Sequence, residues 1–366
     1  MIKLIKPYIG FNEVENEFRE IFASGIFTKG EYVEKFSNEI KNYVGSKHAF
    51  LMTSATTALT MCLKVLDIQQ GDEVIVSDFS FPATVNVVED LGAIPVFADV
   101  SRITFNMAPD QLEKKISNKT KAVIFVDALG NPSGITNIKL ICEKYNIPLI
   151  DDAACAIGSS EKSIKSGSLA DLSCFSFHPR KLLTTGEGGA ITTNHEKYAE
   201  RLKVKLNHGA KVEDGKLDFV DYGYNYRLAD MQCVMGLKQL QKLDSIVKER
   251  NHIKNEFCEK LEPLGFKSQK TSPEVIHNVQ SMVFVIPEGM NRDELIIFLR
   301  GKEIESTIGT YCLSSTSYYR KKYNDVQANS SFLEKNTITL PCYQNVDVDY
   351  ICRKIKEYVE NYRGLK

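Results

Sequence analysis

Short apolar runs alternate with amphipathic helical patterns over the first half of the chain. Each apolar run predicts a buried strand, and the runs lie at residues 48–53, 72–78, 94–100, 121–129, 147–153, 172–177 and 188–193. Helical patterns separate several of them, as at residues 58–66, 83–92 and 138–146. Strands that alternate with helices predict a largely parallel sheet with helices on both faces. Binding sites in such sheets form at the carboxyl ends of the strands.

The second half of the chain carries a different pattern. Helical periodicity with charged outer positions continues from residue 227 to residue 261 and predicts one long connecting helix. A strand-like run at 281–286 and helical runs at 292–302 and 350–362 follow. A chain of 366 residues exceeds the size of a single core. We therefore expect an α/β protein with a large, mainly parallel αβα domain, residues 1–245, and a smaller α+β C-terminal domain, residues 246–366.

Charge and cysteine content narrow the classes of partner. The 46 basic and 47 acidic residues give a formal net charge of -1, which favours neither nucleic acid nor a membrane surface as a partner. No apolar run approaches the roughly 18 residues that span a bilayer, and the first residues lack the apolar core of a signal peptide. Nine cysteines without a CxxC pair and six histidines without ligand spacing predict reduced thiols in the cytoplasm and no metal site.

Lys181 lies between an apolar run and a cluster of glycines, in the stretch FSFHPRKLLTTGEGGAITTN. A lysine becomes a nucleophile at neutral pH when burial or nearby positive charge favours its neutral form. The apolar neighbours of Lys181 and the adjacent Arg180 provide both conditions, while a solvated loop lysine is the ordinary alternative. The glycines of residues 184–189 lack Walker spacing, so they predict a tight turn rather than a phosphate loop.

Two consecutive carboxylates, Asp151 and Asp152, end the apolar run IPLIDDA. Successive strand residues point to opposite faces, so one of the two should face a site at the strand end. A carboxylate at that place can keep the pyridine nitrogen of a pyridoxal cofactor protonated, as the cofactor needs in order to act as an electron sink. The alternative is a helix N-cap before the following AACAI.

Hydroxyl groups gather where another predicted strand meets a helix, in SATTAL. Ser54, Thr56 and Thr57 lie at that helix N-terminus, where free backbone amides attract an anion, although simple capping explains them equally well. Ser176 could add a hydroxyl to a phosphate, and Phe81 could either stack on a planar ring or belong to the core. A lysine nucleophile, a strand-end carboxylate, a phosphate-binding helix N-terminus and an aromatic face are together what pyridoxal 5'-phosphate requires.

The motifs that contain these residues resemble those of the DegT/DnrJ nucleotide-sugar aminotransferases, which are pyridoxal-phosphate (PLP) enzymes of fold type I. FSFHPRKLLTTGEGG resembles that family's lysine motif, SATTAL its SGTAAL, DDAACAIG its EDAAQALG and DYGYNYRLADMQ its GYNYR segment. IFTKGEYVEKF, which contains Thr28, and TITLPCYQN also fit the family's pattern. The resemblance extends along nearly the whole chain.

The resemblance implies a role for each matched residue. Lys181 would hold the cofactor as a Schiff base, and Asp152 would pair with the pyridine nitrogen. Asn225 of GYNYR would reach the cofactor phosphate of the other subunit, so we expect a homodimer with shared active sites. The other expected cofactor contacts are Ser54, Ala55, Thr56 and Ser176 at the phosphate, Phe81 over the ring, and Cys155 near the phenolic oxygen.

Several positions depart from the family's pattern. Cys155 replaces a glutamine, Asp127 a histidine and Ala55 a glycine. The stretch GTYCLSSTSYY, which contains Tyr311, lacks the prolines and histidines usual at the sugar-nucleotide end of the site. Expected substrate contacts are His178, Thr28 and Tyr311, with a purely structural role as the alternative for His178.

These observations together predict a PLP-dependent aminotransferase. We expect glutamate as the amino donor and a keto sugar, a nucleotide-linked 4-keto-6-deoxyhexose, as the acceptor. The altered segment around Tyr311 keeps a small phosphorylated ketone or a cyclitol open as the acceptor. A non-catalytic PLP-binding regulatory protein is a further alternative, against which Lys181 and Asp152 argue.

Overall fold

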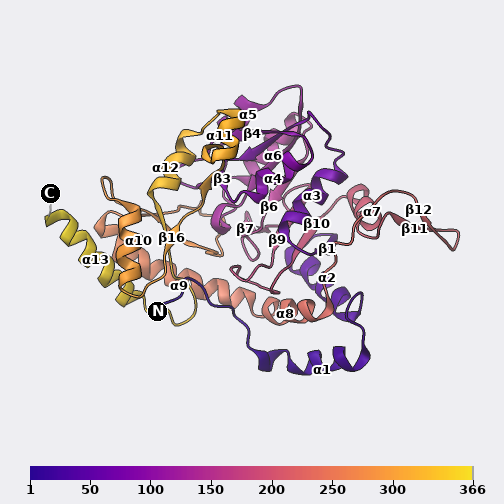
Figure 1. Cartoon of the computed structure of the whole chain (residues 1–366), viewed down its shortest axis with the longest axis horizontal. Coiled ribbons are helices and arrows are strands. Elements are labelled where there is room, and N and C mark those ends of the chain that lie inside the picture. The colour runs from indigo at the N-terminus through magenta and orange to yellow at the C-terminus, as the bar shows by residue number, and fades with distance from the viewer. Residues whose placement is uncertain (365–366) are drawn as a thin grey trace.

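A seven-stranded sheet forms the centre of the larger part of the molecule (Figure 1). The computed structural model describes residues 1–364. The strands, in spatial order, are β1 (His48–Met52), β10 (Gly189–Thr193), β9 (Leu172–Ser176), β6 (Leu149–Asp152), β5 (Thr120–Val126), β2 (Glu73–Ser77) and β4 (Ile94–Ala98). Strand β10 pairs antiparallel with both of its neighbours, and the other pairs are parallel. The predicted mainly parallel sheet is confirmed, and each strand overlaps a predicted apolar run.

Alternate residues of the strands pack on opposite faces of this sheet. On β5, Ala122 and Ile124 join one core cluster, while Val123 and Phe125 join another. The helices on the first face are α3 (Ala55–Val65), α4 (Ala83–Asp90) and α7 (Glu196–Lys205). Those on the second face are α5 (Pro109–Lys115), α6 (Ile135–Lys144), α2 (Glu31–Val44) and α8 (Asp230–Leu240). Because both faces are covered, the strands are apolar throughout rather than alternating.

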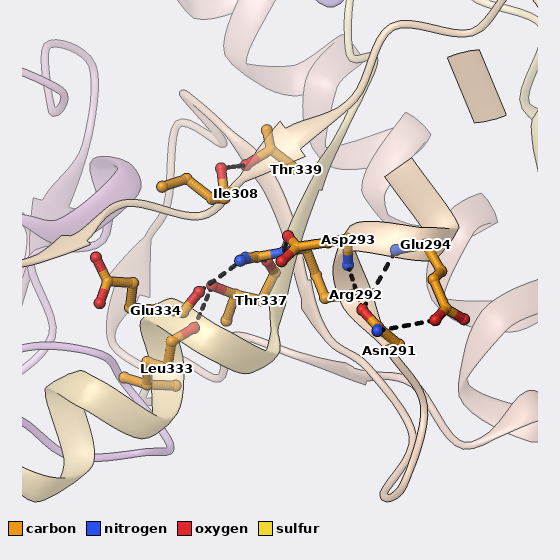
Figure 2. Close-up of polar contacts among 9 residues, drawn as sticks. All are labelled: Asn291, Arg292, Asp293, Glu294, Ile308, Leu333, Glu334, Thr337 and Thr339. Carbon is orange, nitrogen blue, oxygen red and sulfur yellow. Dashed lines mark hydrogen bonds and ion pairs between the residues drawn. The ribbon is translucent and has the colours of Figure 1, made fainter. Parts of the chain in front are cut away.

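A smaller antiparallel sheet follows in the second half of the chain. Its strands, in order, are β13 (Lys267–Ser268), β15 (Met282–Val285), β18 (Thr337–Leu340) and β16 (Thr307–Ile308). The core beside it is formed with α9 (Leu243–Leu261), α10 (Arg292–Gly301) and α13 (Val348–Gly364). Arg292 donates hydrogen bonds to the carbonyls of Glu334 and Thr337 at 2.7 and 2.9 Å, which joins α10 to the start of β18 (Figure 2). The predicted α+β character of this part is confirmed.

The prediction of one long helix over residues 227–261 is wrong. The structure has two helices, α8 and α9, separated at Gln241 and Lys242, where Lys242 leaves helical geometry with φ -112° and ψ 7°. No glycine or proline marks this break, so the helical periodicity continues across it.

The chain returns to the large sheet late in the sequence. Leu313 and Tyr319 belong to the core cluster that covers the first face of the seven-stranded sheet. The N-terminal Ile2, in turn, pairs with Ile304 and packs against the smaller core. The division of the chain at residue 245 stays a prediction.

The remaining elements are short, apart from α1, and connect the two sheets or extend from them. The β11–β12 hairpin projects from the body of the molecule (Figure 1). No helix within residues 1–364 is long and apolar enough to cross a membrane. These elements are η1 (Phe11–Glu13), α1 (Glu15–Ser24), β3 (Phe79–Ser80), η2 (Ala128–Gly130), β7 (Ser160–Glu161), β8 (Ile164–Lys165), β11 (Ala210–Glu213), β12 (Lys216–Phe219), η3 (Glu262–Leu264), β14 (Val275–Ile276), β17 (Tyr311–Cys312), η4 (Leu313–Ser315), α11 (Ser317–Tyr323) and α12 (Ala328–Asn336).

Candidate active site

Lys181 lies on the irregular segment that joins β9 to β10, at the carboxyl end of β9. Leu182 and Leu183, which follow it, are buried in the core. The lysine side chain is half-buried, and its Nζ donates a hydrogen bond to Cys155 Sγ at 3.0 Å. The alternative of a solvated loop lysine therefore does not describe this side chain. Its ammonium group is held at one edge of the large sheet.

A buried glutamine fixes the backbone on both sides of Lys181. Gln280 Oε1 accepts a hydrogen bond from the Leu182 amide at 2.8 Å, and its Nε2 donates to the Arg180 carbonyl at 2.7 Å. These two bonds restrain the residues before and after the lysine, so the direction of the side chain is set by a residue far away in the sequence. Nothing in the sequence pattern pointed to Gln280.

Asp152 ends β6 and lies on the same side of the sheet as Lys181. Its Oδ2 accepts a hydrogen bond from Thr84 Oγ1 at 2.7 Å, and its Oδ1 accepts one from the Ala154 amide at 3.3 Å. Burial raises the pKa of this carboxyl, while the Thr84 hydrogen bond and the positive charge of Lys181 act in the opposite direction. The element that follows Asp152 is strand β7 and not a helix, so the helix-cap alternative does not hold.

Asp151 points to the other face of β6, as alternation along a strand requires. Burial raises its pKa well above the usual carboxyl value, and the negative charges of Asp127 and Asp152 add to the effect. Asp127, at the end of the neighbouring strand β5, is also fully buried, and its Oδ2 accepts a hydrogen bond from Ser166 Oγ at 2.7 Å. Burial, with the charges of Glu161 and Asp152, raises the pKa of Asp127 to about 7. Three carboxyl groups thus meet at the ends of two adjacent strands.

The N-terminus of α3 forms a cup beside β10 and β9. Ser54 is the N-cap, and its Oγ accepts a hydrogen bond from the Thr57 amide at 3.1 Å. The capping alternative is therefore correct for Ser54 and Thr57. The first two amides of the helix, from Ala55 and Thr56, have no intrahelical acceptor and remain available to an anion.

Strand pairing brings Ser176 to this cup. Ser176 is opposite Gly189, and Gly189 is opposite Met52, just before the helix. A Cβ at Gly189 would lie 2.6 Å from the Ser54 carbonyl carbon and 2.8 Å from the Ala55 amide nitrogen. The TTGEGG turn thus ends in a glycine that lets β10 pass directly against the helix N-terminus.

Phe81 and Tyr311 meet at the entrance to α4. Phe81 is 64% exposed, so it does not belong to the core. Its ring contacts that of Tyr311 edge to face, with centroids 6.3 Å apart. Strand β17 positions Tyr311, because it pairs with Ser80 of β3.

Two of the predicted site residues, Thr28 and Asn225, lie apart from Lys181, whereas His178 is bonded through its carbonyl to the Lys181 amide at 2.8 Å. Thr28 is exposed and pairs with Ala229, and Asn225 is exposed on the irregular segment just before that pair. Asn225 has no hydrogen bond to any described residue. His178 is half-exposed, and its Nδ1 accepts a hydrogen bond from the Arg180 amide at 3.2 Å. The structure of one chain therefore does not bring Thr28 or Asn225 into the site that contains Lys181.

A cavity of about 180 Å³ opens beside Lys181 and Cys155. It is bounded by the N-terminal residues, by the segment around Gln280 and by the smaller sheet. Two arginines that the sequence did not single out as ligand contacts, Arg180 and Arg250, also line it. Asp152 and the residues of the α3 cup are not among those that line this cavity. The half-buried amine of Lys181, the strand-end carboxylate of Asp152 and the anion-binding cup are nevertheless a donor set that fits a phosphorylated pyridine aldehyde.

The chain belongs to the DegT/DnrJ/EryC1/StrS aminotransferase family, whose model matches residues 10–356. It is a PLP-dependent aminotransferase with the corresponding α/β fold, and pyridoxal 5'-phosphate is its cofactor. The resemblance stated from the motifs is confirmed.

Two relatives and one solved structure illustrate the similarity. The chain is 30% identical to GDP-perosamine synthase of Vibrio cholerae over 98% of this chain and 99% of the relative. It is 32% identical to UDP-4-amino-4,6-dideoxy-N-acetyl-beta-L-altrosamine transaminase of Campylobacter jejuni over 88% of each. The sugar aminotransferase Spr1654 of Streptococcus pneumoniae, in its apo form, superposes with a TM-score of 0.93 at 27% identity, covering 100% of this chain and 99% of that one. PLP and PMP (pyridoxamine phosphate) forms of the same neighbour are known.

Proposed function

We propose that the protein transfers an amino group from glutamate to a nucleotide-linked keto sugar, a 4-keto-6-deoxyhexose, in the cytoplasm. The names of the relatives support a nucleotide-sugar substrate, since one is a GDP-sugar synthase and another a UDP-sugar transaminase. A 4-amino-4,6-dideoxy sugar, as in the second name, is what amination of a 4-keto-6-deoxyhexose yields. Nine free cysteines support a reducing compartment.

The observation that carries this proposal is the convergence of Lys181, Asp152 and the α3 N-terminus at one edge of the sheet. In the proposal, Lys181 holds the cofactor covalently and Asp152 accepts a hydrogen bond from its protonated ring nitrogen. The amides of Ala55 and Thr56, with the Ser176 hydroxyl, bind the phosphate dianion. Phe81 would cover one face of the ring, and Cys155 would lie beside its phenolic oxygen.

When bound, pyridoxal phosphate accepts the electron pair that remains at the donor's α-carbon after that carbon loses its proton. The protein's own part is proton transfer and positioning. Lys181 Nζ, when free, would take the proton from the donor's α-carbon as a general base and then give it, as a general acid, to the C4' carbon of the cofactor. As a carboxylate, Asp152 would hold the ring nitrogen protonated; the hydrogen bond from Thr84 and the charge of Lys181 favour that carboxylate form against the effect of burial. Gln280 fixes the backbone on either side of Lys181 and so restrains the direction of the lysine side chain.

We further propose a homodimer in which Asn225 of each chain completes the other chain's site. The β11–β12 hairpin and the segment after it carry large exposed apolar side chains: Val212, Leu217, Phe219, Val220 and Tyr222. Exposed apolar residues on a projecting hairpin support an interface with a second copy. A two-fold contact repeats on both subunits, so the exposed Asn225 of each chain, which follows this hairpin, can serve the other chain's site.

The proposal is tested in two half-reactions. Purified PLP enzyme with L-glutamate should lose its PLP absorbance and release one 2-oxoglutarate per site. The PMP form is then mixed with UDP- and GDP-linked 4-keto-6-deoxyhexoses, a phosphorylated ketone and a keto-cyclitol, and recovery of the PLP spectrum identifies the acceptor. Recovery with the nucleotide sugars is the expected result. Recovery only with the phosphorylated ketone or the cyclitol would identify that compound as the acceptor instead of a nucleotide sugar. A PLP absorbance that L-glutamate does not change would favour a non-catalytic regulatory protein.

A further inference from the structure

Asp78 is a buried carboxylate that joins two distant parts of the chain. It follows β2 and is fully buried, and its partners lie 234 and 236 residues later in the sequence. Its Oδ1 accepts a hydrogen bond from the Ser314 amide at 2.7 Å, and its Oδ2 accepts hydrogen bonds from Ser314 Oγ at 2.8 Å and Cys312 Sγ at 3.2 Å. Burial raises the pKa of this carboxyl to about 6, while the hydrogen bonds from Ser314 and Cys312 act in the opposite direction. Above that pKa the group is a carboxylate that accepts three hydrogen bonds.

The segment that Asp78 holds carries Tyr311. Strand β17 pairs with β3, which places Tyr311 opposite Ser80. The Leu313 amide donates to the Asp78 carbonyl at 2.8 Å, which continues the pairing by one residue. The backbone therefore sets the register of this segment. The carboxylate restrains the turn that follows, because both hydrogen bonds from Ser314 lie beyond the paired residues.

The far end of the same segment is bound to α4. Glu89, near the end of that helix, accepts hydrogen bonds from the hydroxyls of Tyr318 and Tyr323 at 2.9 and 2.7 Å. Residues 311–323 are therefore attached at two places, the carboxylate at the end of β2 and the helix α4. Tyr311 lies at the first of these places, so its position depends on the carboxylate.

Tyr311 in turn borders the candidate active site through Phe81. The two rings meet edge to face with centroids 6.3 Å apart, and Tyr311 is 39% exposed. The Phe81 carbonyl accepts a hydrogen bond from the Thr84 amide at 3.1 Å, and Thr84 Oγ1 donates to Asp152 Oδ2 at 2.7 Å. A short chain of contacts therefore leads from the carboxylate of Asp152 to the ring of Tyr311.

We propose that Asp78 is a positioning residue for the keto acceptor, because it holds Tyr311 beside Phe81 as a fixed aromatic wall at the edge of the site. The inference rests on the proposed function, in which Phe81 covers the cofactor ring and a nucleotide-linked sugar is the acceptor. That acceptor is larger than glutamate and extends beyond its reacting carbonyl, so it reaches the exposed rings, whereas the donor does not need them. Tyrosine offers such a ligand an apolar ring face and a hydroxyl. A ring that is fixed before the ligand arrives spares the loss of affinity that ordering a mobile side chain causes.

A single tryptophan measures whether Asp78 holds the segment. The chain has no tryptophan, so Tyr311→Trp provides one fluorophore at the proposed wall, and its quenching by acrylamide in the apo-protein measures how freely solvent reaches it. Asp78→Asn and Ser314→Ala are then each added to this parent. Asp78→Asn keeps the size of the side chain but replaces one accepting oxygen with an NH₂ donor. Ser314→Ala removes one donor and keeps the carboxylate.

Asp99→Asn is the matched control. Asp99 follows β4, the neighbour of β2 in the sheet, and is also buried. It accepts hydrogen bonds from the Asn329 amide at 2.9 Å and the Ser330 amide at 3.0 Å, so it holds α12 rather than residues 311–316. The same substitution at Asp99 therefore removes a buried carboxylate of the same kind without changing the bonds that hold Tyr311.

Asp78→Asn should raise the quenching constant of the reporter by up to about twofold, because the held side chain is already 39% exposed. Ser314→Ala should raise it less, and Asp99→Asn should leave it unchanged. Equal quenching in the parent and in Asp78→Asn, or an equal rise in Asp99→Asn, would overturn the inference. If Asp78→Asn does not fold, Ser314→Ala decides alone, and unchanged quenching in that variant would overturn the inference.

The kinetic measurement uses the chain without the reporter. With UDP- or GDP-linked 4-keto-6-deoxyhexose and the PMP form, Asp78→Asn should raise the KM for the acceptor by about five- to tenfold, as expected for the loss of one charged hydrogen bond. The limiting rate should stay close to that of wild type, and the L-glutamate half-reaction should be unchanged. A merely structural role of Asp78 would impair both half-reactions, so equal losses in the two would contradict positioning.

The fluorescence result does not depend on the acceptor. If the PMP form aminates none of the compounds, the proposed function is refuted, while a rise in quenching confined to Asp78→Asn and Ser314→Ala would still support the role of Asp78 in holding Tyr311. Amination of a nucleotide sugar with equal KM in wild type and Asp78→Asn would refute the positioning role alone.

Discussion

Replacing Gly189 by alanine should damage the phosphate cup in a predictable way. A Cβ at this position would lie 2.6 Å from the Ser54 carbonyl carbon, 2.7 Å from the Phe175 carbonyl oxygen and 2.8 Å from the Ala55 amide nitrogen. All three atoms belong to backbone, two of them at the start of α3 and one in β9. No flexible side chain can move aside, so either β10 or the helix N-terminus must shift.

The cost can be estimated from overpacking. Inserting a methyl group into a close-packed region costs about 1–3 kcal/mol, against which the reduced freedom of the unfolded chain returns about 0.4–1 kcal/mol. We therefore expect Gly189→Ala to lower the free energy of unfolding of the apo-protein by about 1–2 kcal/mol. Since the shift separates the amides of Ala55 and Thr56 from Ser176, the affinity for pyridoxal phosphate should also fall.

Gly301→Ala is the matched control. Gly301 ends α10, and a Cβ there meets no atom within 4 Å. The same substitution should therefore be neutral or stabilising by up to about 1 kcal/mol, with unchanged cofactor affinity. Urea unfolding of both apo-proteins and titration with pyridoxal phosphate measure the two effects. A Gly189→Ala variant as stable as Gly301→Ala and with wild-type cofactor affinity would refute the placement of the cup.

Three further predictions concern the carboxyl groups and the dimer. Asp152→Asn should abolish the glutamate half-reaction while Asp151→Asn reduces it less, because only Asp152 faces Lys181; equal losses in stopped-flow absorbance would contradict this. Asp127 has a pKa raised to about 7, against roughly 3.9 in an unfolded chain, so between these values the folded state binds more protons and the free energy of unfolding falls as pH rises. Asp127→Asn should therefore stabilise the protein more at pH 8 than at pH 5, by an amount on the order of a few kcal/mol, and an equal effect at both pH values in urea unfolding would show that the carboxyl is not the cause. Mixing inactive Lys181→Ala and Asn225→Ala variants should restore activity, since exchange creates one intact site per heterodimer, whereas confirmed exchange without activity would rule out Asn225 acting across the interface.

Much of the fold follows from the sequence because both kinds of element have a strong local signal. Strands covered on two faces are apolar throughout, so each strand of the large sheet overlaps a predicted run. The same signal fails at Lys242, where α8 and α9 separate without a glycine or proline, because a change of helix direction leaves the periodicity intact.

The candidate site could be predicted as far as it depends on strand ends. Lys181, Asp152 and Ser176 each follow or end a predicted strand, and parallel strands bring such ends to one edge. Phe81 could not be assigned to the surface or the core from its sequence neighbours, since exposure depends on where β3 and β17 meet.

Residues that act over long separations left no local signal. Gln280 bonds to the backbone on either side of Lys181, although it lies about a hundred positions away in the sequence. Arg250 lines the cavity from the middle of α9, whose sequence has only the usual amphipathic pattern of a surface helix. Their roles depend on tertiary contacts, and a single sequence does not encode those as a pattern.

The central claim is that Lys181 is the amine that holds the cofactor and carries out amino transfer. Borohydride reduction of the PLP-loaded enzyme, followed by proteolysis and mass spectrometry, tests it most directly. The account predicts one phosphopyridoxyl group per chain, on the peptide that contains Lys181, and protection from labelling when the enzyme is first converted to its PMP form with L-glutamate. A label on any other lysine, or labelling of Lys181 that glutamate does not prevent, would contradict it.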